Sequence, residues 1–381
     1  MHHNSFIDRY AAALLSRQHL RPTGRTPWVV ATAEAVDWIA GLEFGVVSSV
    51  GMQTWEMVTA LAVRRKLPLQ LIVPVRSAAE FDTTCDEIRH QFNLRRYPVS
   101  FVPVSLSEES GGGHTRTANR RLMITRDRLV VDAADLLVPI SIRPRGSMAR
   151  LINAAADDGT VVERRFLIDP PPRADSFQVN VDQKRLNPEL DTLADRYLIH
   201  WTRATNQPWP DERWVDFYGD IIEADRWPRS GLATLKRILK TGRLIASTEN
   251  MPDCTPTVSF SGLPPRDVVP LMTWRARYNR MSFEPYGIAI DCRAAKSIDI
   301  QPVAYYDPKK SEKPGAADRW LSQSVGRKTD WRAEREYRYR GDVLLKWFDP
   351  EQIVIVCHRP SECAGLRRRF PYRVVSVGQA G

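Results

Sequence analysis

The N-terminal half of the chain alternates apolar runs of strand length with segments of helical spacing. Runs rich in β-branched residues predict strands at 28–32, 44–49, 69–75, 99–104, 128–131 and 136–142. Apolar spacing of 3.6 residues predicts helices at 6–18, 55–65, 79–92 and 149–156. Alternation of this kind predicts an α/β domain, a Rossmann-like doubly wound parallel sheet.

Three consecutive prolines begin at Pro170, and the composition of the chain changes after them. Proline lacks a backbone donor and stiffens the chain, so a linker is expected over 170–194. Beyond it, tryptophans are frequent and strands shorter, which predicts an α+β domain over 195–381. We therefore expect an N-terminal helix within 1–27 and the Rossmann-like domain over 28–169, a two-domain organisation that suits 381 residues.

Composition narrows the class of protein. The net charge of +10 favours an anionic partner, DNA, RNA or a dinucleotide, although a generally arginine-rich composition explains it equally well. No apolar run approaches the roughly 20 residues of a membrane span, so no membrane partner is expected. The N-terminal residues do not resemble a secretory signal. Five scattered cysteines without a Cys-x-x-Cys pair suit a reducing cytosol and predict a cytoplasmic protein. The pair Cys357-His358 lacks a second ligand pair, so no metal site is predicted.

Small and basic residues follow two of the predicted strands in the first domain. They are Gly45, Ser48 and Gly51 in one segment, and Arg143, Gly146 and Ser147 in the other. Such loops allow backbone N–H groups and a helix N-terminus to approach a phosphate. Tight strand-to-helix turns account for the same glycines, and both interpretations stay open.

Residues 28–168 loosely resemble the SLOG superfamily, which includes DNA-processing protein A and the lysine-decarboxylase-like nucleotide hydrolases. In that group a Gly-Ser at the start of a late helix helps to form a nucleotide pocket, and Gly146-Ser147 matches it. The Pro-Gly-Gly-x-Gly-Thr signature of the hydrolase branch is absent. The resemblance therefore implies ligand sensing or nucleic-acid binding rather than hydrolysis.

The second domain carries an ordered series of short motifs. The apolar run 197–203 turns polar at His200, and a predicted helix at 230–239 ends before Gly242 and a further strand. A Thr-Val-Ser-Phe-Ser-Gly segment follows at 257–262. Near the C-terminus, Glu-Arg-Glu spans 334–336.

In this order the motifs resemble ADP-ribosyltransferase domains over about 195–357. The similarity is to the DNA-targeting ADP-ribosyltransferase toxins and to a related bacterial family of unknown function. It implies an enzyme that uses NAD as substrate, either an ADP-ribosyltransferase acting on nucleic acid or protein or an NAD glycohydrolase. It also implies a bacterial toxin or phage-defence effector, with the first domain as a ligand sensor.

The resemblance assigns the catalytic roles to two carboxylates. Cleavage of the bond between ribose C1′ and nicotinamide develops positive charge on the ribose, which a nearby carboxylate stabilises. Glu336 matches that carboxylate and would also hold the ribose 2′-hydroxyl. Glu334, expected on the same face of one strand, would orient or deprotonate the acceptor.

The resemblance also places NAD contacts near the His motif. His200 would hydrogen-bond a ribose hydroxyl, and the backbone of Trp201 would face the carboxamide, where the family often has glycine. Thr202 would support His200 or contact a phosphate, and Arg203 is a further expected contact of NAD that could compete with His200 for it. An aromatic ring, either Tyr286 or Phe260, would stack on the nicotinamide.

Each motif taken singly has a structural explanation. Glu334 and Glu336 stand among arginines, as in many solvated strand faces, and a lone histidine is often structural. Two other functions stay open. One is a non-enzymatic nucleotide-sensing or DNA-binding protein with a degenerate transferase fold. The other is a nucleoside-phosphate hydrolase that uses the first domain.

Overall fold

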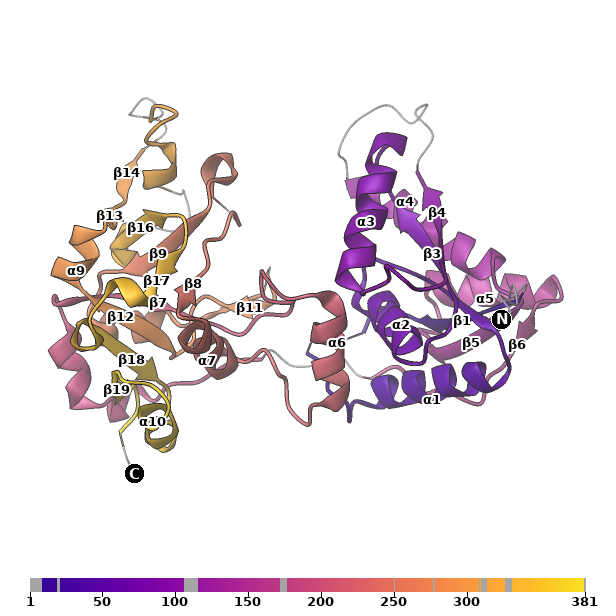
Figure 1. Ribbon diagram of the computed structural model, residues 1–381, viewed down its shortest axis with the longest axis horizontal. Coiled ribbons are helices and arrows are strands. Elements are labelled where there is room, and N and C mark those ends of the chain that lie inside the picture. Colours follow the sequence, from indigo (N-terminus) through magenta and orange to yellow (C-terminus); the bar gives the residue numbers. More distant parts are fainter. Residues whose placement is uncertain are drawn as a thin grey trace. The chain divides into compact units, whose positions relative to one another are not determined.

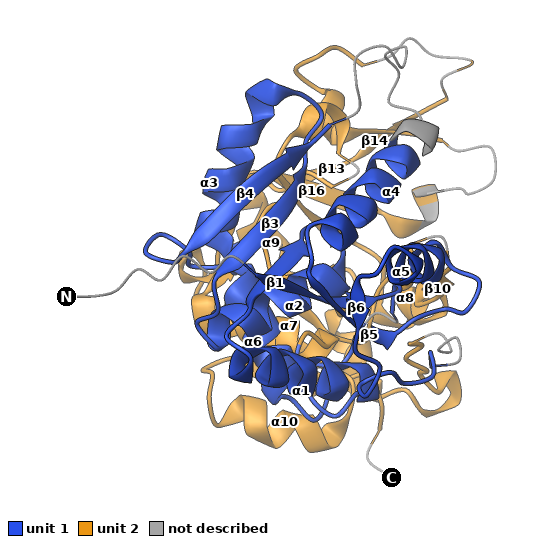
Figure 2. Ribbon diagram, turned by 90° about the vertical axis from the view of Figure 1, so that its right-hand side faces the viewer, with its two compact units in different colours: residues 1–174, 211–228 blue, residues 175–210, 229–381 orange. Residues whose placement is uncertain are grey.

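The structure is a computed structural model, shown in Figure 1. It describes residues 9–18, 21–105, 116–171, 177–249, 251–276, 278–307, 309, 314–325 and 331–379. The chain forms two compact units (Figure 2). Unit 1 comprises 1–174 and 211–228, and unit 2 comprises 175–210 and 229–381. Within the described ranges, no helix has the length and apolar character needed to cross a membrane.

Unit 1 is an α/β unit with a Rossmann-like sheet. In the described part of the chain the sheet has six strands, all parallel, in the order β4-β3-β2-β1-β5-β6. The strands are β1 (Tyr10–Leu15), β2 (Gly45–Ser49), β3 (Leu69–Pro74), β4 (Val99–Val104), β5 (Leu136–Ser141) and β6 (Val161–Val162). The helices are α1 (Pro27–Gly41), α2 (Gln53–Arg64), α3 (Phe81–Gln91), α4 (Arg116–Asp132), α5 (Ser147–Asp157) and α6 (Trp214–Glu223). One buried cluster joins α1, α2, α3 and α6 to one sheet face, and another joins α4 and α5 to the opposite face.

Three predicted elements of unit 1 have a different secondary structure. The helix expected within 1–27 is the strand β1, the strand expected at 28–32 lies in α1, and the strand expected at 128–131 lies in α4. The sequence of β1 favours a helix, but it pairs with β2 and β5 and is buried almost throughout. Burial between two neighbouring strands therefore outweighs the helix propensity of alanine and leucine. Pro27 begins α1 because its fixed φ suits a first helical position.

The domain boundaries also differ from the expected ones. Leu186, Leu190 and Leu193, in the expected linker, are buried in a core of unit 2, while residues 172–176 lie outside the described ranges. Residues 211–228 interrupt the expected domain 195–381, because the apolar face of α6 packs in the core of unit 1. Figure 2 shows α6 in the colour of unit 1. A contiguous boundary fails because buried apolar side chains, and not sequence position, decide which core a segment joins.

Unit 2 is an α+β unit built on one large sheet. Over the described residues its seven strands follow the order β13-β16-β9-β7-β12-β18-β19. All neighbours are antiparallel except β18 and β19. These strands are β7 (Tyr197–Trp201), β9 (Thr257–Ser261), β12 (Gly287–Asp291), β13 (Gln301–Pro302), β16 (Glu336–Arg340), β18 (Ile353–Cys357) and β19 (Arg373–Ser376). The helices are α7 (Gly231–Thr241), α8 (Pro265–Val268), α9 (Cys292–Ser297) and α10 (Pro360–Arg367). Two-stranded pairs complete the unit, formed by β8 (Arg243–Leu244) with β17 (Val343–Leu344), β10 (Trp274–Arg275) with β11 (Arg280–Met281), and β14 (Ala304–Tyr306) with β15 (Ser322–Ser324).

Helix α7 begins and ends at the signals its sequence carries. The Ser230 hydroxyl caps the N-terminus by accepting a hydrogen bond from the Ala233 N–H at 3.2 Å. Gly242 closes the C-terminus with a left-handed φ of 66°. Leu235 and Leu239 bury one face of the helix against the sheet. The predicted helix, glycine and following strand are confirmed, and they place α7 beside the candidate site.

Candidate active site

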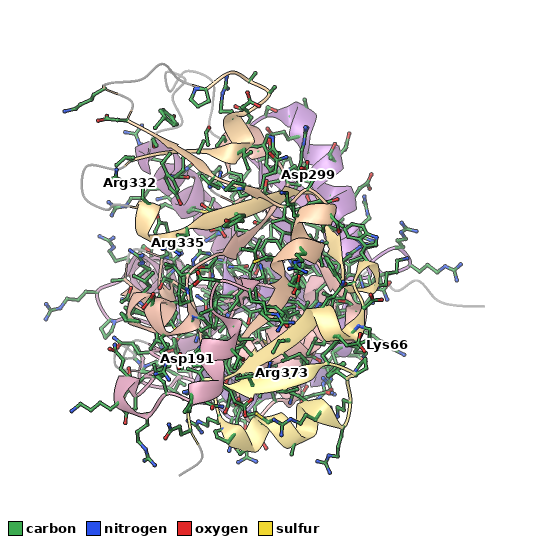
Figure 3. The ribbon with its side chains drawn as sticks, turned by 90° about the vertical axis from the view of Figure 1, so that its left-hand side faces the viewer. Lys66, Asp191, Asp299, Arg332, Arg335 and Arg373 are labelled. Atoms are coloured by element: carbon green, nitrogen blue, oxygen red, sulfur yellow. The ribbon has the colours of Figure 1, made fainter. Side chains whose placement is uncertain are left out.

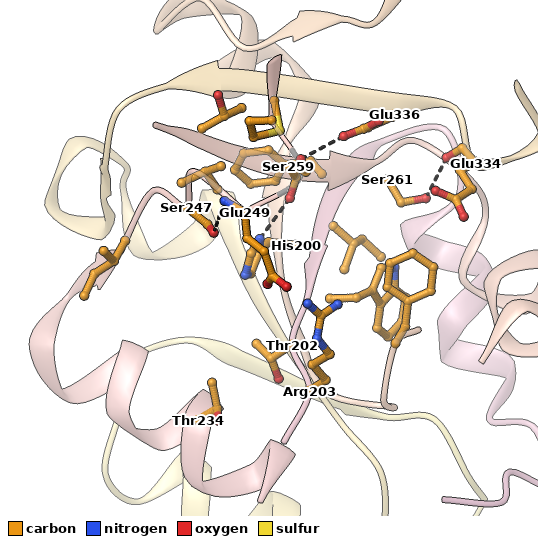
Figure 4. A pocket seen from close by; sticks show the side chains of 18 of the residues that line it. His200, Thr202, Arg203, Thr234, Ser247, Glu249, Ser259, Ser261, Glu334 and Glu336 are labelled. Atoms are coloured by element: carbon orange, nitrogen blue, oxygen red, sulfur yellow. Dashed lines mark hydrogen bonds between the residues drawn. The ribbon is translucent and has the colours of Figure 1, made fainter. Parts of the chain in front are cut away.

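A pocket of about 430 Å³ lies in unit 2, where β7 and β9 meet. The two strands are antiparallel neighbours, with Ile199 opposite Ser261. Seven of the residues predicted from the sequence line this pocket (Figure 4): His200, Trp201, Thr202, Arg203, Phe260, Glu334 and Glu336. Segments more than 130 positions apart in the sequence therefore converge on a single pocket.

His200 is held by the neighbouring strand. Its Nδ1 lies 2.9 Å from the carbonyl oxygen of Ser259, and its ring meets Phe260 edge-on at 5.9 Å between centroids. Burial lowers the pKa of His200, and the charge of Arg203 lowers it further, against the opposing effect of the Ser259 hydrogen bond. A carbonyl only accepts, so the neutral ring carries its proton on Nδ1. Nε2 is then left as an acceptor for a hydroxyl group.

Glu336 is fixed by a bidentate ion pair. Arg338 Nε lies 2.9 Å from Oε1 and Arg338 Nη2 lies 3.0 Å from Oε2. The two residues are two positions apart on β16 and so share a face of the strand. The Ser259 hydroxyl also donates to Oε1 at 2.8 Å. Ser259 thus contacts His200 with its carbonyl and Glu336 with its hydroxyl, which fixes both groups relative to each other.

Glu334 occupies a different backbone setting from the predicted one. It ends the short 3₁₀ helix Trp331–Glu334, and β16 begins only at Glu336. Arg335 between them has a φ of 43°, in the left-handed region that costs a non-glycine residue energy. The expectation that both glutamates lie on one strand face is therefore wrong. Both nevertheless line the pocket, because the turn at Arg335 redirects the chain.

The Glu334 carboxyl group has a pKa suited to proton transfer. Burial raises this pKa to about 7, and the negative charge of Glu336 adds to the increase, while Arg275 opposes it. A carboxyl group with a pKa near neutrality exchanges a proton efficiently under physiological conditions. When two neighbouring carboxyl groups lie in different environments, one commonly stabilises charge and the other acts as the base.

Most of the arginines around these glutamates face solvent, but Arg338 is buried and pairs with Glu336. Arg335 lies at the surface in Figure 3, with 60% of its side chain exposed, and Arg332 is also exposed. The glutamates themselves are only partly exposed and line the pocket. A simple solvated strand face therefore does not describe Glu334 and Glu336.

Arg203 supplies a cation to the pocket wall. Its Nη1 donates to the carbonyl of Ser282 at 3.2 Å. Burial lowers its pKa to about 10, and Arg280 adds to the decrease, so the group is still protonated at neutral pH. Glu249 also lines the pocket and pairs with Arg280 at 3.0 Å. That hydrogen-bonded pairing lowers the pKa of Glu249 and keeps its carboxylate ionised.

Several of the residues that were expected to contact NAD have mainly structural contacts. The Tyr286 hydroxyl donates to Glu362 Oε1 at 3.0 Å, and Tyr286 is not among the pocket-lining residues. Phe260 does line the pocket, but it is only 2% exposed and packs in a core of unit 2. Thr202 braces β7 with a backbone N–H bond of 2.7 Å to the Tyr286 carbonyl. Trp201 lines the pocket, but its indole packs in the core on one sheet face.

The predicted ligand residues of unit 1 divide between the two ends of the sheet. Gly45 begins β2, where a Cβ atom would lie 2.6 Å from the Tyr10 ring, so it allows close packing at the amino end. Ser48 is fully buried and donates to the Trp55 carbonyl at 3.0 Å. Both residues belong to β2 itself and not to the loop that was expected to approach a phosphate. Gly51, with a φ of 85°, does follow the carboxyl end of β2.

The second predicted segment of unit 1 lies at the carboxyl end of β5. The Arg143 N–H donates to Ser16 Oγ at 2.9 Å, and its guanidinium donates to the Arg17 carbonyl at 2.7 Å. Gly146 caps α5, and Ser147 is its first residue. The segment therefore meets the loop after β1 where strand order reverses, the usual location of ligands in such sheets. The hydrogen bonds to Ser16 and Arg17 also give Arg143 a structural role that requires no ligand.

Sequence reasoning missed several pocket residues. Ser259 and Ser261 stand either side of Phe260, and their polar-apolar alternation indicates a strand with one face toward a pocket. Arg338 does not line the pocket but holds Glu336, and it was detectable as a basic residue two positions later on the same strand. Glu249 carried no such signal, because only folding brings its loop to the pocket. Among the described residues, no group of three or more His, Cys, Asp or Glu could hold a metal ion.

Comparisons with known proteins add little to this geometry. No protein-family model matches the sequence. No curated protein matches it either. One similar solved structure is the X-ray structure of DNA processing protein A (DprA) from Streptococcus pneumoniae, at 12% identity and a TM-score of 0.27. The match covers 40% of this chain and 49% of that chain, so it spans about half the length of that protein. A TM-score this low supports no conclusion about fold or function.

Proposed function

We propose that unit 2 is an ADP-ribosyltransferase-like domain that cleaves NAD and transfers ADP-ribose to an acceptor or to water. The observation that carries this proposal is the convergence of His200, Glu334 and Glu336 on one pocket. These residues come from two separate motifs, the His200 segment and the Glu-Arg-Glu segment, whose order resembles that of ADP-ribosyltransferases. A shared pocket is the arrangement that a common active site requires.

The residues present suit the cleavage step. The bond between ribose C1′ and the nicotinamide nitrogen breaks, and nicotinamide leaves with the electron pair as a neutral molecule. Glu336, held by Arg338 and Ser259, would stabilise the positive charge that develops on the ribose and accept a hydrogen bond from its 2′-hydroxyl. His200 Nε2 would accept a hydrogen bond from another ribose hydroxyl, with its ring held in place by the edge-on contact with Phe260.

The transfer step needs a base. The acceptor forms a bond to C1′ and releases one proton, which Glu334 would take up, because its pKa of about 7 leaves a substantial unprotonated fraction at neutral pH. With water as the acceptor, the same step yields ADP-ribose. The net charge of +10 favours DNA or RNA as the acceptor in the transferase case.

The test is nicotinamide release from NAD by the purified protein, with and without DNA or RNA. We expect the Glu336→Gln variant to lose release by at least about 100-fold, because a neutral amide cannot stabilise the developing charge. Glu351→Gln is the matched control, since Glu351 is an exposed residue of unit 2 that does not line the pocket. Stimulation by one nucleic acid would identify the acceptor class.

Two results would reject the proposal. One is the absence of nicotinamide release under all conditions, together with a failure of NAD to bind. The other is release that Glu336→Gln leaves unchanged. Either result would favour a binding protein whose ligand is recognised in unit 1.

A further inference from the structure

A second, smaller lobe of about 140 Å³ adjoins the candidate active site within unit 2. The two lobes share four lining residues: His200, Pro210, Thr234 and Ile245. The second lobe extends from there along α7 to the start of β8, and its basic residues are Arg237 and Arg243. Because the lobes share a wall that includes His200, a ligand longer than the first lobe can continue into the second.

The two lobes differ in charge. Three carboxyl groups, of Glu249, Glu334 and Glu336, line the first lobe together with the guanidinium of Arg203. The second lobe has two guanidinium groups, and none of the described residues lining it is acidic. In Figure 4, Thr234 on α7, which lines both lobes, lies across the pocket from the two C-terminal glutamates. Carboxyl groups therefore line only the first lobe, and the charged residues that line the second lobe are both basic.

Arg237 is held in place by Trp209. Its guanidinium carbon lies 4.6 Å from the centroid of the Trp209 ring, a distance typical of a cation–π contact. The indole Nε1 is in turn 3.3 Å from Thr234 Oγ1, one turn earlier on the same helix. Trp209 thus acts as a positioning residue for Arg237. Arg243 Nε lies 3.5 Å from Asp342 Oδ2, so its charge is shared with a carboxylate outside the lobe.

We propose that the second lobe binds the diphosphate of a dinucleotide, with Arg237 as the principal contact and Arg243 as a supporting one. This inference rests on the proposed function and assigns an orientation to the substrate. NAD carries a positive charge on its nicotinamide ring and negative charge on its diphosphate. The nicotinamide riboside then lies among the carboxylates, and the diphosphate lies beside α7. Guanidinium groups suit this role because they donate two parallel hydrogen bonds to phosphate oxygens.

The experiment is a calorimetric titration of ADP into the full-length protein and two variants. Arg237→Gln should weaken ADP binding by about tenfold or more, since it removes a charge-assisted hydrogen bond. Lys236→Gln is the matched control, because Lys236 is an exposed neighbour on α7 that lines neither lobe and its loss changes net charge equally. Arg237→Lys keeps the charge but not the paired donors, and it should show intermediate affinity.

Kinetics supply the second readout. In Arg237→Gln the KM for NAD in nicotinamide release should rise about tenfold, while the inhibition constant of nicotinamide, which lacks the diphosphate, stays unchanged. Equal ADP affinity in the wild type and Arg237→Gln would overturn the inference. NAD turnover by a wild type that does not bind ADP would also overturn it and leave the proposed function intact. ADP binding that depends on Arg237, without any nicotinamide release, would retain the phosphate lobe and reject the proposed function.

Discussion

Arg338 holds both carboxylate oxygens of Glu336, at 2.9 and 3.0 Å, with only 4% of the arginine side chain exposed. The same guanidinium donates to the Trp320 carbonyl at 2.7 Å, so the pair is tied to the surrounding backbone. The Glu336 side chain is itself 19% exposed. Placing a carboxylate in such a setting requires a fixed counter-charge, because an unpaired charge with little solvent access is costly.

Arg338→Met should therefore destabilise the protein strongly. We expect a loss of about 3 kcal/mol in the free energy of unfolding, measured by urea denaturation at pH 7, because Glu336 is left without its partner. Adding Glu336→Gln to this variant should restore part of the loss. Arg340→Met, an exposed position on the same strand, should change stability by less than about 0.5 kcal/mol. A similar small effect of Arg338→Met would contradict the role of the ion pair.

Glu334 should make activity depend on pH near neutrality. A base must be unprotonated, so kcat for transfer should rise with pH and level off above the pKa of about 7. In Glu334→Gln this rise should be absent and the remaining rate low. A pH profile of nicotinamide release in the presence of the acceptor measures the effect. An unchanged profile in the variant would assign the base to another group.

The Glu334 carboxyl group should also make stability depend on pH. Whereas kcat should rise with pH, the free energy of unfolding should fall. The pKa of this group is about 7 in the folded protein against an ordinary value of 4.5 for a glutamate, so between these values the folded state binds more protons than the unfolded state. The stability that protonated Glu334 contributes is present at low pH and is lost as the pH rises through about 7. Urea denaturation at several pH values should show this component in the wild type and not in Glu334→Gln.

His200 should affect NAD affinity more than folding. His200→Ala removes the acceptor that faces the pocket, and we expect the KM for NAD to rise by about tenfold or more. His200→Gln can donate to the Ser259 carbonyl and also present an acceptor, so it should recover part of the affinity. Equal KM values for His200→Ala and the wild type, with equal melting temperatures, would indicate that the ring does not contact the substrate.

Gly231, the first residue of α7, should not tolerate a side chain. A Cβ atom there would lie 2.3 Å from Glu284 Oε2 and 2.7 Å from Cδ2 of Tyr286, and Glu284 is only 2% exposed. Gly231→Ala should therefore lower the free energy of unfolding by about 1–3 kcal/mol. Gly365→Ala, in α10 with no atom within 4 Å, should instead be neutral or stabilising by up to about 1 kcal/mol. Chemical denaturation of both variants compares the two sites directly.

The regular elements of the fold were predictable where pattern and burial agree. The β-branched run at 69–75 became β3, and the capped helix ending before Gly242 became α7. The prediction failed for β1, whose Ala11–Leu15 segment favours a helix in isolation. It failed also for α1, in which Trp28, Val29 and Thr32 are buried at helical spacing although they read as a strand. In both cases neighbouring elements decided the outcome, because tertiary packing outweighs a propensity of less than about 1 kcal/mol per residue.

The pocket was predictable only in part. His200, Glu334 and Glu336 could be named because their residue types suit the chemistry and because their order resembles a family. Tyr286 and Phe260 could not be separated by sequence, and only the packing of Tyr286 toward Glu362 distinguishes them. The turn at Arg335 could not be predicted either, since no sequence signal marks an arginine whose backbone adopts a left-handed φ.

The sequence by itself determined the two fold classes, the helix of the second unit with its cap and terminal glycine, and the residue types available for chemistry. These follow from local periodicity and from backbone preferences, which act over a few residues. Only the tertiary structure decided that α6 joins the core of unit 1, that Ser259 links His200 to Glu336, and that a lobe lined by arginines adjoins the pocket that holds the glutamates. The physical reason is that burial, hydrogen bonding and electrostatics act between residues close in space, and the distances between those residues are set by the packing of the whole unit.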